Sequence, residues 1–145
     1  MTGAEQIMQA VIAALTVPAM TSVPAADVHR DIVRAIEMDA PLAVAVEEGD
    51  EPAPDYPAIG FLDRTLEFRL AVIAKGRNTA ALADPAITEA HGRIMADRTL
   101  GGIVFDITEG ETTRQRDALE KPVLATIKTY RVRYRTSESG LEISP

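Results

Sequence analysis

Near the end of the sequence, arginine occupies every second position of the stretch KTYRVRYRT: Arg131, Arg133 and Arg135. Alternate residues of a β-strand point to opposite faces, so these arginines would form a row with spacings of roughly 6.7 Å. Guanidinium groups bind carboxylates and phosphates through paired hydrogen bonds. The row therefore suits an acidic protein surface or nucleic acid, while the solvated side of an ordinary strand would show the same pattern.

Acidic residues are concentrated in one short segment: Glu47, Glu48, Asp50, Glu51 and Asp55. Their oxygens could hold a divalent cation, but the segment lacks the alternating ligand order of a calcium loop and is interrupted by prolines. We therefore expect a solvated acidic loop without a metal. In a ring of identical copies this loop could meet the arginine row of another copy, which makes both groups candidate interface residues.

Other residues that could take part in catalysis are scattered. His29 and His91 are the only histidines, and neither has an acidic or histidine partner at a metal-ligand spacing. The sequence has no cysteine, no nucleophile elbow and no phosphate-binding glycine motif. We expect no catalytic site, metal or cofactor, and hence a protein that is not an enzyme.

The charge is unevenly distributed along the chain. Residues 1–102 contain 15 acidic and 8 basic residues, whereas residues 103–145 contain 7 of each. The net charge of −7 opposes binding to nucleic acid, because displacing counterions requires a concentrated basic surface. Nucleic acid is therefore the least favoured ligand of the arginine row.

No apolar stretch reaches the roughly 20 residues that a membrane-spanning helix requires. No lysine or arginine precedes Arg30, so the N-terminus lacks the basic flank that opens a secretory signal. We therefore expect no membrane association and a protein that stays inside the cell that makes it.

The length of 145 residues and the hydrophobic content of 46% suit one globular domain, residues 1–145. Thr2 and Glu5 have the spacing of a capping box, which predicts a helix ending near Thr16. Asp84 as N-cap and Pro85 at the first helical position predict a second helix. Its apolar stripe would be Ile87, Ala90, Ile94 and Met95.

Alternating apolar residues predict four strands. They are residues 42–46, residues 62–73, a run through Ile103, Phe105 and Ile107, and the closing stretch 128–136. Arg64 is the one charged residue on the apolar side of its strand. Residues 28–36 fit either a helix or a short strand, with periodicity slightly favouring the helix. Residues 109–122 are polar and fit a strand end or a mobile hairpin tip.

This order of elements predicts an α+β fold with a mainly antiparallel sheet of about four to five strands. We expect two helices on one face of the sheet and the other face left for a partner.

Several of these segments resemble one family. The sequence DRTLGGIVFDI after a helix, the polar insertion and the closing YRVRYRT resemble the tail terminator proteins of long-tailed bacteriophages, also called tail completion proteins or minor tail protein U. The stretch HRDIVRAIEMDAPLAVAVEEGDE is similar to the first strands of this family. The resemblance covers residues 1 to 137 and favours a strand at VHRDIV.

The resemblance implies a structural subunit that forms a hexameric ring on the last ring of the major tail tube protein. This ring would stop tube polymerisation and offer a joining surface to a head-completion or connector protein. DNA would pass through the lumen without specific binding. The protein would assemble in the host cytoplasm and end in the virion tail.

Two other classes stay open. One is another head–tail connector or tube protein of related fold, of which a tube protein would polymerise into long filaments. The other is a small intracellular ligand-binding domain or enzyme, which would need a pocket with convergent polar groups.

Overall fold

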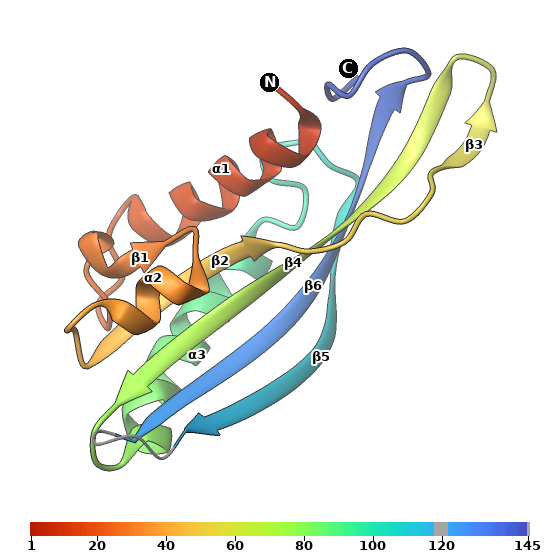
Figure 1. The fold of residues 1–145 in the computed structure, drawn as a ribbon. Helices are drawn as coiled ribbons and strands as arrows, with labels where there is room; N and C mark the ends of the chain where they lie inside the picture. Colours follow the sequence, from red (N-terminus) through yellow and green to blue (C-terminus); the bar gives the residue numbers. More distant parts are fainter. Residues whose placement is uncertain (118–121, 145) are drawn as a thin grey trace.

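The computed structural model describes residues 1–117 and 122–144, which form an elongated sheet with helices on both faces (Figure 1). The helices are α1 (Gly3–Thr16), α2 (Ile32–Glu37) and α3 (Thr79–Ala96), with a 3-10 turn at Ala25–Asp27. The strands are β1 (Val28–His29), β2 (Leu42–Glu48), β3 (Asp55–Ala58), β4 (Phe61–Lys75), β5 (Asp106–Asp117) and β6 (Val123–Ser137). The sheet order is β1-β2-β4-β6-β5, and β3 pairs with β4. Only the β1–β2 pair is parallel, so the predicted α+β class with a mainly antiparallel sheet is confirmed.

The two central strands, β4 and β6, are 15 residues long and paired along their whole length. Their predicted alternation is confirmed. Leu66, Phe68 and Leu70 of β4 are buried on the same side as Tyr130 and Val132 of β6. The rings of Phe68 and Tyr130 stack with centroids 5.0 Å apart, which fixes the register at the centre of the core.

Both long helices pack on this side of the sheet, as predicted. α1 buries Ile7, Met8, Val11 and Leu15 there, and α3 buries Ala83, Ala86, Ala90 and Ile94. At the start of α1, the Thr2 hydroxyl accepts a hydrogen bond from the Glu5 N–H at 3.1 Å, and the helix ends at Thr16. We call the sheet face opposite α1 and α3 the open face.

The segment 28–36 combines both predicted structures. Val28 and His29 form the short parallel strand β1, and Asp31 then caps the six-residue helix α2, accepting from the Val33 N–H at 2.8 Å. α2 packs Ala35 against small residues on the open face at the β2 end of the sheet: Ala43, Ala45 and Ala71. The expectation that this face is left uncovered is therefore wrong at this end, where the alanines leave room for a helix.

α3 begins earlier than predicted. It starts at Thr79, after Asn78 in a left-handed conformation, so Pro85 lies inside the helix and Asp84 is not its N-cap. The residues before Asp84 are good helix formers, and the buried stripe already begins at Thr79. This packing outweighs the backbone hydrogen bond that proline cannot make.

β5 begins later than predicted. Residues 98–103 form turns, so Ile103 precedes the strand, and Phe105 is exposed while Val104 enters the core. The Phe105 N–H donates to the Arg133 carbonyl at 2.7 Å, just before regular pairing starts at Asp106. β5 continues to Asp117. Of the polar segment 109–122, predicted as a strand end or a mobile turn, residues 118–121 lie outside the described residues.

Arg64 has partners that explain its place on the core side of β4. Its Nε donates to the Thr136 hydroxyl at 2.9 Å, and its guanidinium lies 3.8 Å from the Glu51 carboxylate. Glu51 also accepts the Tyr134 hydroxyl proton at 2.9–3.0 Å. The acidic loop thus folds back to neutralise the one arginine on the apolar side.

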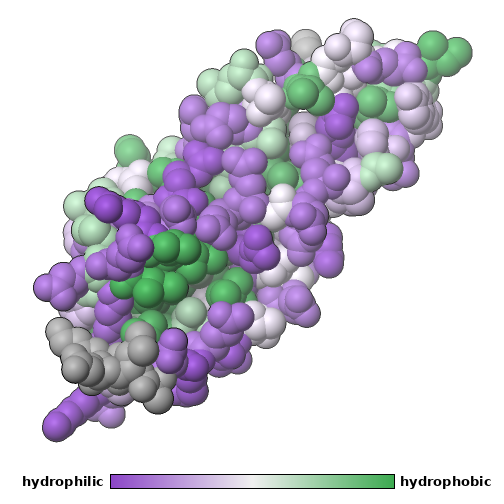
Figure 2. Space-filling view, in the orientation of Figure 1, coloured by the Kyte–Doolittle hydropathy of each residue, from purple (hydrophilic) through white to green (hydrophobic). Residues whose placement is uncertain are grey.

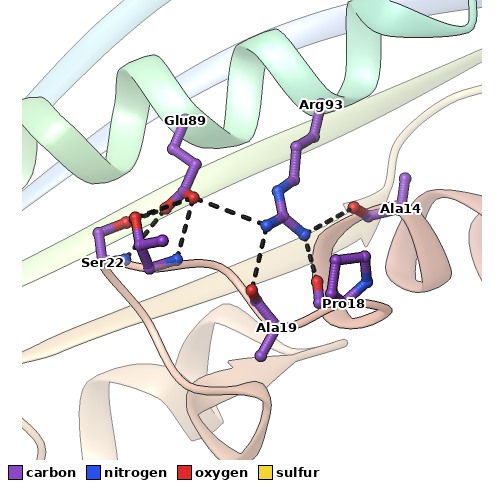
Figure 3. A network of polar contacts seen from close by, with 7 residues as sticks. Ala14, Pro18, Ala19, Ser22, Glu89 and Arg93 are labelled. Atoms are coloured by element: carbon purple, nitrogen blue, oxygen red, sulfur yellow. Dashed lines mark hydrogen bonds and ion pairs between the residues drawn. The ribbon is translucent and has the colours of Figure 1, made fainter.

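Two residues one turn apart on α3, Glu89 and Arg93, hold the segment that follows α1 (Figure 3). Glu89 accepts hydrogen bonds from the backbone N–H groups and hydroxyls of Thr21 and Ser22 at 2.6–3.1 Å. Arg93 donates to carbonyl oxygens that otherwise lack helical partners: Ala14, Pro18 and Ala19. The hydrogen bonds from Ser22 and Thr21 lower the pKa of Glu89 to about 2.

Glu89→Gln should destabilise the protein by about 1–3 kcal/mol at pH 7, because an amide replaces an ionised acceptor of four hydrogen bonds. The folded-state pKa of Glu89 is lower than its ordinary value of 4.5, so this stability is present above about pH 4.5 and is lost as the pH falls towards about 2. Urea unfolding of both proteins at several pH values measures the difference, which should shrink in acid.

The matched control is Glu111→Gln, which makes the same chemical change at an exposed position of β5. Equal losses in the two variants at pH 7 would contradict the role assigned to Glu89.

Candidate interaction surface

The arginine row lies on the open face. Tyr130, Val132 and Tyr134 of β6 are buried in the core, so the alternating arginines Arg131, Arg133 and Arg135 point the other way. This is the division that the period of two predicts. Their neighbours on β4, in register, are Glu67, Thr65 and Asp63.

Arg135 is already bound within the chain. Its guanidinium donates to the Asp63 carboxylate at 2.8 and 3.4 Å, which raises the pKa of Arg135. It also lies between two aromatic rings, 5.7 Å from the centroid of Phe61 and 5.0 Å from that of Phe105. Both contacts are cation–π interactions. Arg135 therefore links β6 to β4 and to the start of β5.

Arg131 and Arg133 are exposed, and neither side chain makes a hydrogen bond to another described residue. Arg133 is opposite Asp106 in the register of β5 with β6. The Asp106 carboxylate, however, accepts two hydrogen bonds of 2.8–2.9 Å from Arg98. Of the three arginines, Arg131 and Arg133 are thus the two with donors available for an external acceptor.

The acidic candidates do not form one cluster. Glu47 accepts the Ile32 N–H at 3.0 Å, and Glu48 pairs with Arg30 at 2.9 Å. Glu51 binds Tyr134 and Arg64, whereas the exposed Asp50 only pairs through its backbone with Glu67. Within one chain, the acidic run and the arginine row do not meet. Whether they meet between copies stays a prediction.

Asp63 is the functional partner that the sequence analysis missed. It lies outside the acidic run, within the strand predicted for residues 62–73, where alternation alone gives it no partner. The signal that identifies it is the register of β4 against β6, which places Asp63 opposite Arg135. Strand pairing over a sequence distance of 72 residues is not readable from local periodicity.

His91 also gains partners from distant parts of the chain. Its Nδ1 lies 2.6 Å from the Tyr130 hydroxyl, and its Nε2 lies 3.9 Å from the Glu109 carboxylate. Glu109 accepts a hydrogen bond from Lys128 at 2.8 Å, which lowers the pKa of Glu109. Burial raises the pKa of Tyr130. Among the described residues, no three histidine or acidic side chains are arranged to hold a metal ion.

Exposed apolar side chains lie at and beside the turn of the β3–β4 hairpin, at the end of the sheet where Phe61 pairs with Ser137 (Figure 1). Tyr56 is 69% exposed, Ile59 is 97% exposed and Phe61 is 39% exposed. We call these three residues the hairpin tip. Phe61 keeps its contact with Arg135, whereas the almost fully exposed Ile59 contributes nothing to the core, so its apolar surface is available to a partner.

A hollow of about 180 Å³ lies on the open face towards the other end of the molecule. It is lined by Ile36, Gln115, Arg116, Asp117, Val123 and Ala125. An apolar patch is visible on this side of the molecule (Figure 2). The open face thus carries an apolar hollow towards one end and the exposed Arg131 and Arg133 further along β6, an arrangement suited to noncovalent binding of a protein.

No protein-family model and no curated protein matches the chain. The relation to tail terminators therefore stays a prediction from the sequence resemblance. In the part of the chain that the structure describes, no helix is both long and apolar enough to cross a membrane.

The three arginines should respond differently to truncation. Arg131→Ala and Arg133→Ala should leave the midpoint of thermal unfolding unchanged within about 1 °C, since exposed side chains without partners contribute little. Arg135→Ala should lower it by about 2–4 °C, because it removes an ion pair and two ring contacts. Calorimetry measures the shifts, and equal values for all three variants would contradict the assignment.

Proposed function

We propose that this chain is the structural subunit of a phage or prophage tail terminator, which forms a hexameric ring on the tail tube. The sequence resemblance motivates the proposal, and one structural observation carries it. The long helices α1 and α3 cover one face of the sheet, while exposed apolar and charged groups lie at separate places on the other face. A subunit of this kind can bind neighbours on more than one side.

The proposed mechanism is geometric. Ring closure buries the lateral surfaces of each copy, and one face of the ring then matches the last ring of the major tail tube protein. The opposite face does not accept another tube ring, so polymerisation stops. That face presents the joining surface for a head-completion or connector protein, and no step requires catalysis.

The charge of the chain suits this role. From Glu47 to Asp63 the sequence contains six acidic residues and no basic residue. Acidic residues that line a ring would repel the phosphates of DNA and let a duplex pass without binding. In this proposal the subunit assembles in the host cytoplasm and remains in the virion tail.

The experiment that tests the proposal measures the mass distribution of the purified chain at rising concentration, together with its effect on growing tail tubes. Mass photometry should show a discrete species at the mass of a hexamer, alone or on tube ends, and added chain should arrest tube elongation. Filaments of the chain itself would instead identify a tube protein. A monomer that leaves tube growth unchanged would contradict the terminator function.

Charge reversal of the two available arginines should weaken this assembly. The double variant Arg131→Glu/Arg133→Glu retains its fold, because neither side chain has an internal partner among the described residues. We expect the fraction of ring at a fixed concentration to fall at least severalfold and the loss to be smaller at high salt. Unchanged assembly would show that Arg131 and Arg133 are part of a solvated strand face and not of an interface.

A further inference from the structure

We propose that the hairpin tip of one copy inserts into the hollow of the next copy. Asp50 of the first copy then lies beside Arg131 and Arg133 of the second. The inference rests on the proposed function in one respect, that copies of this chain associate. It goes beyond that function by naming the two surfaces that meet.

The hairpin tip is held in place for such a contact. The Glu138 N–H donates to the Gly60 carbonyl at 3.0 Å, and the Glu138 carboxylate accepts the Gly60 N–H at 3.2 Å. Gly60 has a φ of 92°, which permits the tight turn next to Ile59. The exposed isoleucine is therefore carried on a turn that is bound at its base, and little conformational freedom is lost when it is buried.

The hollow has the size and lining that an apolar side chain needs. Ile36 of α2 and Val123 and Ala125 of β6 form its apolar walls, and its volume is about 180 Å³. For comparison, a protein cavity of about 150 Å³ accommodates benzene. Gln115 of β5 lines the same hollow and pairs in register with Ala125.

The charges on the two surfaces match in spacing. The backbone of Asp50 pairs with Glu67, seven residues along β4 from Gly60, which places Asp50 roughly 24 Å from the turn. On β6, Arg131 and Arg133 lie six and eight residues from Ala125, or roughly 20 and 27 Å. A tip seated at Ala125 therefore brings the exposed Asp50 of the incoming copy, in the segment before β3, level with both arginines.

The contact must join different copies. Phe61 lies at one end of β4, and Ala125 pairs with Ile73, 12 residues further along that strand. This separation is roughly 40 Å, so a chain cannot fill its own hollow. Because the two surfaces are unlike, each copy receives one neighbour and enters another, which is a heterologous contact; it forms a ring when the rotation between successive copies closes.

Disulfide trapping tests the contact, since the chain has no cysteine of its own. Ile59→Cys combined with Gln115→Cys places one thiol on the tip and one at the hollow. Under mild oxidation we expect covalent oligomers at least about tenfold faster than for Ile59→Cys combined with Leu82→Cys, since association holds only the first pair in reach. Leu82 is 36% exposed on α3, across the sheet from the hollow.

A second experiment separates the two halves of the contact. Ile59→Asp and Ile36→Asp should each weaken self-association at least about tenfold, because each places a charge in an apolar contact. Mixed together they should form one-to-one complexes, because each retains the half that the other lacks. Leu82→Asp should assemble normally, and circular dichroism should show that all three variants are folded.

The outcomes distinguish this contact from the function on which it rests. Selective trapping with complementation of the two variants supports the contact. A ring of the unmodified chain with equal trapping of both cysteine pairs overturns the contact and leaves the terminator proposal standing. If the unmodified chain caps tail tubes but Ile59→Asp caps them equally well, the hairpin tip is not the lateral contact.

Discussion

The pairing of β4 with β6 is the constraint on which the rest of the structure depends. It runs through 15 residues of each strand and sets which side chain of one faces which side chain of the other. One side of this pair forms the floor under α1 and α3, where Phe68 stacks on Tyr130. The same register brings Asp63 to Arg135 and Thr136 to Arg64, so this ion pair and this hydrogen bond follow from the backbone pairing.

Features that depend on local chemistry were predictable from the sequence. Strands with a period of two, the cap at Thr2 and the end of α1 are set by residues close to one another, and the structure has them as expected. Features that depend on packing were not. α3 begins before Pro85 because a buried stripe begins at Thr79, and α2 packs on the open face because three alanines on the sheet make room for it.

The candidate surface shows the same division. The outward direction of Arg131, Arg133 and Arg135 followed from alternation alone. The difference in their contacts, with only Arg135 bound to other described residues, did not. Arg135 is bound by Asp63 and by the rings of Phe61 and Phe105, whose nearness to Arg135 comes from pairing across the sheet. The acidic run was likewise read as one group, although Glu48 and Glu51 have separate partners in Arg30 and Arg64. A charge pattern identifies residues that bind, and the register decides whether they bind internally.

The place of β6 also governs when the protein can fold. It follows every other strand in the sequence, yet it lies between β4 and β5. A growing polypeptide leaves the ribosome N-terminus first. β4 and β5 are therefore synthesised before β6, the strand with which both of them pair. Until β6 has emerged, α1 and α3 lack the part of the core that Tyr130, Val132 and Tyr134 supply. A chain whose synthesis has not reached β6 therefore lacks the strand with which both β4 and β5 pair.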